Sequence, residues 1–273
     1  MTYAAPTHVR EYRIRNHDMA DPRRTVEVHA APEQLEQLAT GGYMVRERLI
    51  TGEHLETLRA AIDELAAGIK GKEDITIRRF GGLFLRNLPD RHPVFLEMLK
   101  FAPTLSVARA VLGPQVQLHA MVMRVTYPDQ PNQETHWHFH QRVIPDPLPV
   151  FFSRPQVLDN LIYLDDVDEA TGPLCVVPGT HLQDLDLHAN LYDDLPGQVT
   201  LTVPAGTCVT AHANLWHRAQ PTTPEGRVRR LLIVGYSPVW MKPVDRLGGG
   251  LTDTLLPDAD TETRELLGLS GYY

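Results

Sequence analysis

The stretch "QVQLHAMVMRVTY", residues 115–127, decides the fold class. It is rich in β-branched residues, and the character of its side chains alternates along it, which is the pattern of a β-strand. It follows Pro114, before which apolar residues recur at helical spacing. The sequence therefore predicts that helix gives way to sheet at this proline.

Further short strands are expected downstream. They are predicted in residues 157–166, 174–178, 198–203, 207–211 and 229–237. Turn-forming pairs such as Pro178-Gly179 and Pro196-Gly197 separate them. Many short strands joined by such turns, after a helical first third, predict a mainly β fold with flanking helices, built as an antiparallel barrel or sandwich.

The predicted helices lie upstream of this sheet. Pro32 opens a short helix that Gly41-Gly42 ends. Thr51 is the expected N-cap of a longer amphipathic helix, in which apolar residues recur every three or four positions. A third helical stretch follows Pro93 and is expected to continue to Gly113.

The length of 273 residues suits a single domain, 1–273. Residues 1–30 are polar and aperiodic, so an arm or an irregular lead-in is expected there. A helical part should occupy about 32–113 and the β core about 115–240, followed by a peripheral tail over 241–273.

Composition excludes two classes of protein. The formal charge is -8 and the basic residues do not cluster, which argues against a nucleic-acid binder. No apolar run reaches the roughly 18 residues that a membrane span needs, so no membrane partner is expected. Cys175 and Cys208 lie in apolar runs and are predicted to be buried thiols, which fits a reducing, cytoplasmic setting.

The stretch "ETHWHFHQR", residues 134–142, holds three alternating histidines. On a strand, His136, His138 and His140 would share one face, and Trp137 and Phe139 the other. Two histidines two positions apart can chelate one metal ion, whereas three would crowd it. The alternative is that they are surface or packing histidines, although three at this spacing favour a metal site.

The predicted site is completed by two more residues that lie later in the sequence. His217 in "ANLWHRAQ" is the candidate for a distant metal ligand. Arg229 begins an apolar strand, so its side chain could enter the mouth of a barrel and bind a carboxylate through both guanidinium nitrogens. By contrast, His119 is expected to line a pocket or the core on the face of Met121 and Met123.

Four blocks of the sequence resemble the phytanoyl-CoA dioxygenase family of non-haem Fe(II), 2-oxoglutarate-dependent oxygenases. They are residues 41–50 with the helix on either side, "HWHFH" (136–140), "LIYLDDVDEATGPLCVVPGTH" (161–181) and "LWHRAQPTTPEGRVRRLLIVGY" (215–236). The third block is the most specific, and the resemblance runs from about 33 to 240. It implies a double-stranded β-helix, the jelly-roll or cupin-like barrel, with helices packed on one side.

The resemblance also implies the roles of individual residues. His138 falls on the first metal ligand, His140 on the position of the ligand carboxylate, and His217 on the distal histidine. Arg229 falls on the arginine that grips the far carboxylate of 2-oxoglutarate. Ala219 departs from the family, which tends to have a small hydroxyl residue there.

The histidine at position 140 changes the formal charge of the metal site that the family resemblance implies. Two histidines and one carboxylate around Fe(II) leave a formal charge of +1, whereas three neutral imidazoles leave +2, which favours anionic ligands. Imidazole still suits iron, so a three-histidine iron centre is expected.

We therefore expect an oxidoreductase that uses Fe(II), O2 and 2-oxoglutarate to oxidise a small organic molecule. The alternatives are a three-histidine dioxygenase that needs no 2-oxoglutarate, a zinc enzyme, and a barrel that only binds a ligand. The proline-rich stretch 141–155 follows the histidines directly and would form a lid, from which Arg142 and Phe152 are candidates for substrate contact.

Overall fold

The computed structural model describes residues 4–13, 23–69, 82–128, 130, 133–140, 157–183 and 191–270. Its main sheet has six antiparallel strands in the order β3-β9-β6-β11-β5-β4, and a smaller sheet has the order β10-β7-β8. The strands of the main sheet are β3 (Tyr43–Arg46), β9 (Thr207–His212), β6 (Leu158–Tyr163), β11 (Arg229–Pro238), β5 (Val116–Thr126) and β4 (Leu83–Leu85). Those of the smaller sheet are β10 (His217–Ala219), β7 (Leu174–Val176) and β8 (Val199–Leu201).

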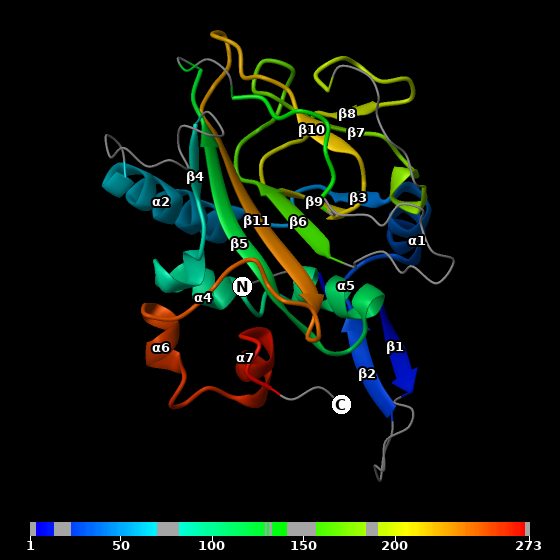
Figure 1. Cartoon of the computed structure of the whole chain (residues 1–273), viewed down its shortest axis with the longest axis vertical. Coiled ribbons are helices and arrows are strands. Elements are labelled where there is room, and N and C mark those ends of the chain that lie inside the picture. Colours follow the sequence, from blue (N-terminus) through cyan, green and yellow to red (C-terminus); the bar gives the residue numbers. More distant parts are fainter. Residues whose placement is uncertain are drawn as a thin grey trace.

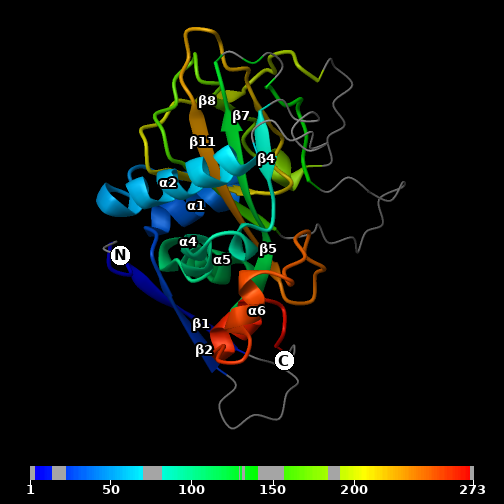
Figure 2. The same cartoon turned by 90° about the vertical axis from the view of Figure 1, so that its left-hand side faces the viewer.

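The two sheets enclose one apolar core. Tyr163, Val209 and Leu231 from the main sheet pack with Leu174 and Val176 from the smaller sheet. The long strands β5 and β11 run side by side through the molecule, and the smaller sheet lies at its upper end (Figure 1, Figure 2). This arrangement is a jelly-roll barrel, as predicted.

The outer face of the main sheet is covered by helices. These are α1 (Pro32–Gly41), α2 (Gly52–Ile69), α4 (Pro93–Met98) and α5 (Ala102–Leu112), with a 3-10 turn, η1 (Leu88–Asp90). The core on this side joins Ile62 of α2 and Phe95 of α4 to Met121, Met123 and Leu232 of the sheet. Alternate residues of β5 and β11 therefore face the helices, and those between them face the barrel interior.

Most predicted boundaries are confirmed within a few residues, but three expectations are wrong. Residues of the first thirty form a hairpin, β1 (His8–Arg13) and β2 (Arg23–Val28), which packs on α5. The third helical stretch is broken into α4 and α5, because Pro103 lies in the first turn of a new helix. The histidine stretch is not a strand: only His138 forms an isolated bridge, to His217.

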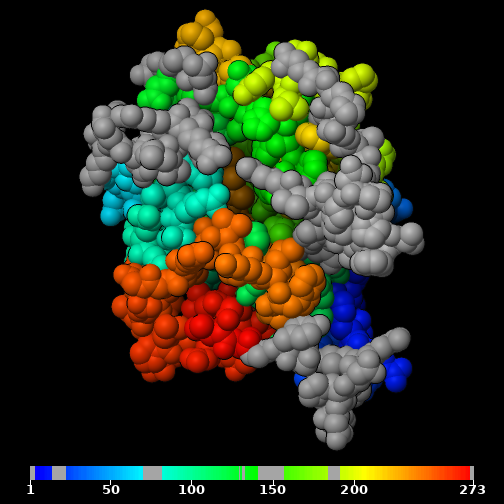
Figure 3. All heavy atoms as spheres, in the orientation of Figure 1, coloured from blue at the N-terminus to red at the C-terminus, as the bar shows by residue number. Residues whose placement is uncertain are grey.

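The C-terminal tail carries two short helices, α6 (Leu251–Leu255) and α7 (Thr261–Leu266). Its orange and red atoms occupy the lower part of the face in Figure 3. Leu266 is fully buried in the helix-side core, and Glu262 and Glu265 form ion pairs with Arg109 of α5. The tail, expected to be peripheral, thus contributes to the packing.

Both cysteines are buried free thiols, as predicted. Within the described ranges, the helices lack the combination of length and hydropathy that crossing a bilayer requires.

Candidate metal centre and co-substrate pocket

Backbone pairing brings the predicted histidines together at one end of the barrel. His138 and His217 exchange two backbone hydrogen bonds of 3.0 Å each, and the His140 N–H donates to the Ala213 carbonyl at 2.8 Å. One ring nitrogen from each of His138, His140 and His217 lies within 4.8 Å of the others. The three side chains that were predicted from sequence therefore converge.

The aromatic residues between the histidines anchor them. Trp137 is almost fully buried and packs with Cys175 and Trp216, and Phe139 packs against the same group. His136, by contrast, is exposed and lies outside the cluster of three, although its ring is 5.4 Å from that of His138. The aromatic side chains thus pack inward as predicted, whereas His136 does not join His138 and His140.

The ring nitrogens that point away from the cluster are all engaged. Nδ1 of His138 is 2.7 Å from the His136 carbonyl, and Nδ1 of His217 is 2.8 Å from the Leu215 carbonyl. Nδ1 of His140 is 3.0 Å from Oδ2 of Asp159. Carbonyls and carboxylates only accept, so each Nδ1 carries the proton and each Nε2 keeps a lone pair for a metal ion.

Burial keeps two of these rings neutral. Desolvation, together with the neighbouring His217, lowers the pKa of His138 to about 2. Desolvation and the neighbouring His140 lower the pKa of His217 to about 4. Both imidazoles are therefore unprotonated at neutral pH, which is the state that binds metal.

Arg229 faces the interior and Arg230 faces outward, as predicted. Arg230 lies between Asp63 of α2 and Asp165, with ion pairs of 2.7 and 2.9 Å. Arg229 is fully buried and donates to the Gly172 carbonyl, and its Nε has no hydrogen-bond partner among the described residues. Gly172 has φ of +74°, and a Cβ there would lie 2.5 Å from the Gln220 carbonyl, so the turn that meets Arg229 requires glycine.

A second buried arginine, Arg124, shares the interior with Arg229. The pairing of β5 with β11 places Arg124 opposite Leu231 and Thr126 opposite Arg229, so the two arginines are diagonal neighbours on one face. Desolvation and the charge of Arg229 lower the pKa of Arg124 to about 9. Burial likewise lowers the pKa of Arg229. Two cations in one buried space create a strong demand for an anion.

Sequence reasoning missed Arg124 and Asp159. Each is a charged residue within a strand that is otherwise largely apolar, "MVMRVT" and "VLDNLIY", and that is the signal that could have marked them. His119 was placed on the wrong face. The register of β5 and β11 slips between Gly235 and Tyr236, so His119 is the extra residue of a β-bulge. Its pKa is lowered by desolvation and also responds to Asp159 and His140.

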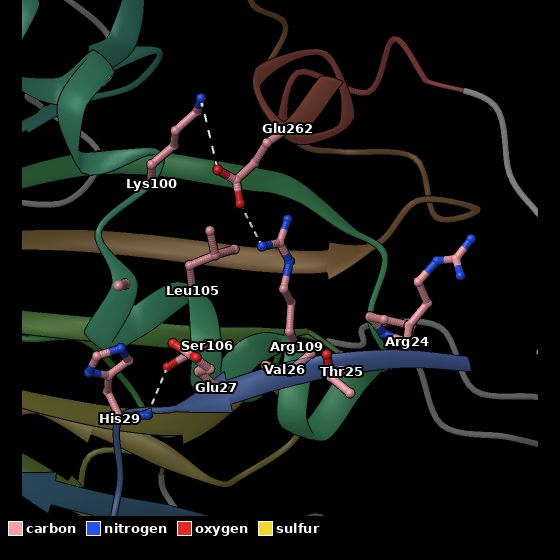
Figure 4. A pocket seen from close by; sticks show the side chains of 12 residues that line it. Arg24, Thr25, Val26, Glu27, His29, Lys100, Leu105, Ser106, Arg109 and Glu262 are labelled. Carbon is pink, nitrogen blue, oxygen red and sulfur yellow. Dashed lines mark hydrogen bonds and ion pairs between the residues drawn. The ribbon is translucent and has the colours of Figure 1, made fainter. Parts of the chain in front are cut away.

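Another pocket, of about 390 Å³, lies far along the fold between β2, α5 and α7. Figure 4 shows that two of its basic residues meet an acid: Lys100 and Arg109 both reach Glu262, at 3.9 and 2.6 Å. These two cations are thus paired within the chain. Arg142 and Phe152, the predicted substrate contacts, lie outside the described residues.

The jelly-roll barrel is the fold of the cupin-like oxygenases. The profile of the phytanoyl-CoA dioxygenase (PhyH) family matches residues 38–230, which is more than half of the chain. The chain belongs to this family. Members of this family use Fe(II) and 2-oxoglutarate as cofactors.

The curated relatives are more distant. The chain is 26% identical over 159 residues to an ectoine dioxygenase of Bordetella parapertussis, covering 55% of this chain and 49% of the relative. It is 29% identical over 168 residues to an ectoine dioxygenase of Nocardia farcinica, covering 59% and 54%. The chain thus matches about half the length of these relatives.

Two solved structures share the fold. The carbocyclase SnoK from nogalamycin biosynthesis has a TM-score of 0.63 and 20% identity, covering 82% of this chain and 95% of that one. HygX from Streptomyces hygroscopicus, with nickel and 2-oxoglutarate bound, has a TM-score of 0.65 and 18% identity, covering 80% and 91%.

Proposed function

We propose that His138, His140 and His217 bind Fe(II), and that the protein uses O2 and 2-oxoglutarate to oxidise a small organic molecule. The observation that carries this proposal is the common tautomer of the three rings. Each Nδ1 faces an acceptor, so three Nε2 lone pairs remain for one cation. Imidazole is a suitable ligand for iron, and the residues present fit the family's metal.

We assign the far carboxylate of 2-oxoglutarate to the arginine pair. Arg229 lies in the interior at the start of β11, with an unused Nε, and Arg124 lies on the same face. A carboxylate held there would accept charge-assisted hydrogen bonds and relieve the repulsion between the two cations. The hydroxyl of Thr126 accepts from the Thr222 hydroxyl at 3.2 Å and lies opposite Arg229 in the strand pairing, so its own proton is a further donor at this place.

The protein's own residues would perform three tasks. The histidines hold the metal, and the arginines orient the co-substrate. The apolar core between the two sheets limits the access of water to the site. Bound iron with 2-oxoglutarate supplies the activation of O2. Three neutral imidazoles carry one negative charge less than the usual set of ligands, which by itself favours an anionic co-substrate.

We leave the substrate at the level of a small organic molecule. The relatives include ectoine dioxygenases, and one HygX structure contains hygromycin B. The small molecules in these names differ from one another, so they do not single out a substrate for this chain. Arg142 and Phe152 remain proposed contacts to the substrate. The buried thiols Cys175 and Cys208 fit a protein of the reducing cytoplasm.

The arginine pair favours this function over its alternatives. A zinc hydrolase or a barrel that only binds a ligand has no evident need for two buried arginines on one face of the barrel interior. A three-histidine dioxygenase that omits 2-oxoglutarate would likewise leave Arg229 without a purpose. Each alternative therefore predicts that 2-oxoglutarate does not bind.

The test combines metal analysis with co-substrate binding. Protein purified anaerobically is reconstituted with Fe(II), its metal content is measured, and 2-oxoglutarate is titrated by calorimetry. We expect one iron per chain, which His138→Ala and His217→Ala lose. His136→Ala is the matched control, because His136 lies next to the cluster but outside it, and it should keep its iron.

Iron that stays bound in the His217→Ala protein, or an iron-loaded parent with no affinity for 2-oxoglutarate, would contradict the proposal. In the second case the three-histidine dioxygenase becomes the better assignment. Preference for zinc over Fe(II) in anaerobic competition would favour the hydrolase.

A further inference from the structure

Asp159 lies directly behind the histidine that replaces the usual carboxylate ligand. It belongs to β6, faces the barrel interior and is buried, with 8% of its surface exposed. Its Oδ2 forms an ion-pair contact of 3.0 Å with Nδ1 of His140, and this oxygen has no hydrogen-bond partner among the described residues. A buried carboxylate in an apolar strand is costly unless it is paired, and His140 is its partner.

His140 needs this support more than the other two histidines. His138 and His217 are each held by the carbonyl of the residue two positions earlier, a contact that the local backbone provides. The side chain of His140 is 45% exposed, and its Nδ1 meets a side chain that is distant in sequence. Its orientation therefore depends on tertiary structure.

The surroundings of Asp159 are shaped to hold its carboxylate in place. Gly235 of β11 pairs with Asp159, and a Cβ at Gly235 would lie 2.6 Å from Oδ1 of Asp159. The carboxylate thus occupies the space that a side chain at 235 would take. The glycine leaves room for an acid, and that acid reaches His140.

The contact between Asp159 and His140 joins an acid to a ring that can donate from Nδ1. An ionised carboxylate that accepts from a ligating histidine fixes the tautomer of the ring and makes it a stronger electron donor.

We propose that Asp159 is a positioning residue for the metal centre. It holds the ring of His140 so that Nε2 faces the metal. Its carboxylate, on the far side of that ring, supplies the negative charge that an aspartate at position 140 would carry. The inference rests on the proposed function, since it requires a metal on the three histidines. It explains how position 140 can be a histidine without leaving the site's positive charge uncompensated.

Titration with Co(II) under anaerobic conditions tests this without turnover. The dissociation constant and the visible ligand-field spectrum are measured for the parent, Asp159→Ala and Asp159→Asn. Removal of such a supporting residue typically weakens metal binding roughly 10- to 100-fold, which we expect for Asp159→Ala. Asp159→Asn keeps the shape and an accepting oxygen but has no charge. Its affinity for Co(II) should therefore lie between those of the parent and Asp159→Ala, and its ligand-field spectrum should differ from that of the parent.

Asp245→Asn is the matched control. Asp245 is also a buried carboxylate, but it accepts from the backbone N–H of Met121 at 2.7 Å and lies outside the histidine cluster. Its loss should lower thermal stability and leave the Co(II) spectrum unchanged.

The outcomes separate the two proposals. If the parent does not bind Co(II), or His140→Ala binds it as well as the parent, the proposed metal centre fails. If the parent binds and His140→Ala does not, but Asp159→Ala and Asp159→Asn match the parent in affinity and spectrum, only the role of Asp159 is overturned. If Asp159→Ala does not fold, the Co(II) affinity and spectrum of Asp159→Asn, compared with those of the parent, test the role of Asp159 on their own.

Discussion

Arg124 and Arg229 are diagonal neighbours on β5 and β11, and both guanidinium groups are buried in the interior of the same barrel. Like charges at this spacing repel in a low-dielectric interior, and each arginine loses hydration as well. An anion bound between them would offset part of this cost. The proposed binding of 2-oxoglutarate at this pair would thus link the stability of the protein to its co-substrate.

The first prediction concerns co-substrate affinity. Arg229→Ala should weaken 2-oxoglutarate binding by on the order of 2–5 kcal/mol, because it removes a buried, charge-assisted contact. Calorimetry of the iron-loaded protein measures the change. Arg230→Ala is the control on the adjacent residue: its ion pairs with Asp63 and Asp165 lie on the helix-covered face, so it should lower stability slightly and leave 2-oxoglutarate affinity intact.

The second prediction concerns Arg124 and stability. Arg124→Met removes one of two repelling charges and keeps an apolar stem, so the ligand-free protein should melt at the same temperature as the parent or higher. Added 2-oxoglutarate should raise the melting temperature of the parent more than that of the variant. A ligand-free variant that melts far below the parent would show that Arg124 serves packing alone.

The third prediction concerns pH. The pKa of His217 is about 4 in the folded chain and near 6.5 in an unfolded one, so the unfolded state binds more protons between these values. Stability of the metal-free protein is then lost as pH falls from about 6.5 toward 4. Denaturant unfolding should show a shallower loss over this range for His217→Gln than for the parent. Equal slopes for the two proteins would contradict the burial argument.

The fourth prediction concerns position 140. His140→Asp would place a second carboxylate near Asp159, and two close carboxylates resist ionising together. We expect His140→Asp to bind Fe(II) more weakly than the double variant His140→Asp/Asp159→Asn, in which one charge is removed. Anaerobic Fe(II) titration of both variants provides the comparison. Equal affinities would show that the two positions do not interact.

The fifth prediction uses Gly235 to move Asp159 without changing any charge. Gly235→Ala brings a Cβ to 2.6 Å from Oδ1, so the carboxylate must shift away from its present place. Weaker Co(II) binding and a changed ligand-field spectrum are expected, in a protein that still carries every proposed ligand. An unchanged spectrum would mean that the carboxylate can move without disturbing His140.

Several features were readable from the sequence because they depend on near neighbours. Alternation along 229–237 placed Arg229 inside and Arg230 outside, since successive side chains of a strand face opposite ways. The proline at 32 and the glycines at 41–42 marked the ends of α1 for similarly local reasons. Spacing, with the family resemblance, also joined His138 and His140 to His217.

Other features were not predicted correctly from the local sequence. The first thirty residues lack a clear period, because β1 and β2 form a mostly exposed hairpin with little apolar alternation. The histidine stretch reads as a strand but pairs only at His138, since its conformation is fixed by contacts to β10 and to Ala213.

The period of the strands by itself left a barrel or a sandwich open and placed Arg229 on an inward face. The resemblance of the motifs to the family selected the jelly-roll barrel and the three histidines His138, His140 and His217. Only the tertiary structure decided that Asp159 stands behind His140 and that Arg124 stands beside Arg229. Such contacts depend on which strands pair, in which register, and on a bulge that shifts one side chain to the other face. Those choices are made by the packing of the whole sheet, which no single stretch of the chain encodes.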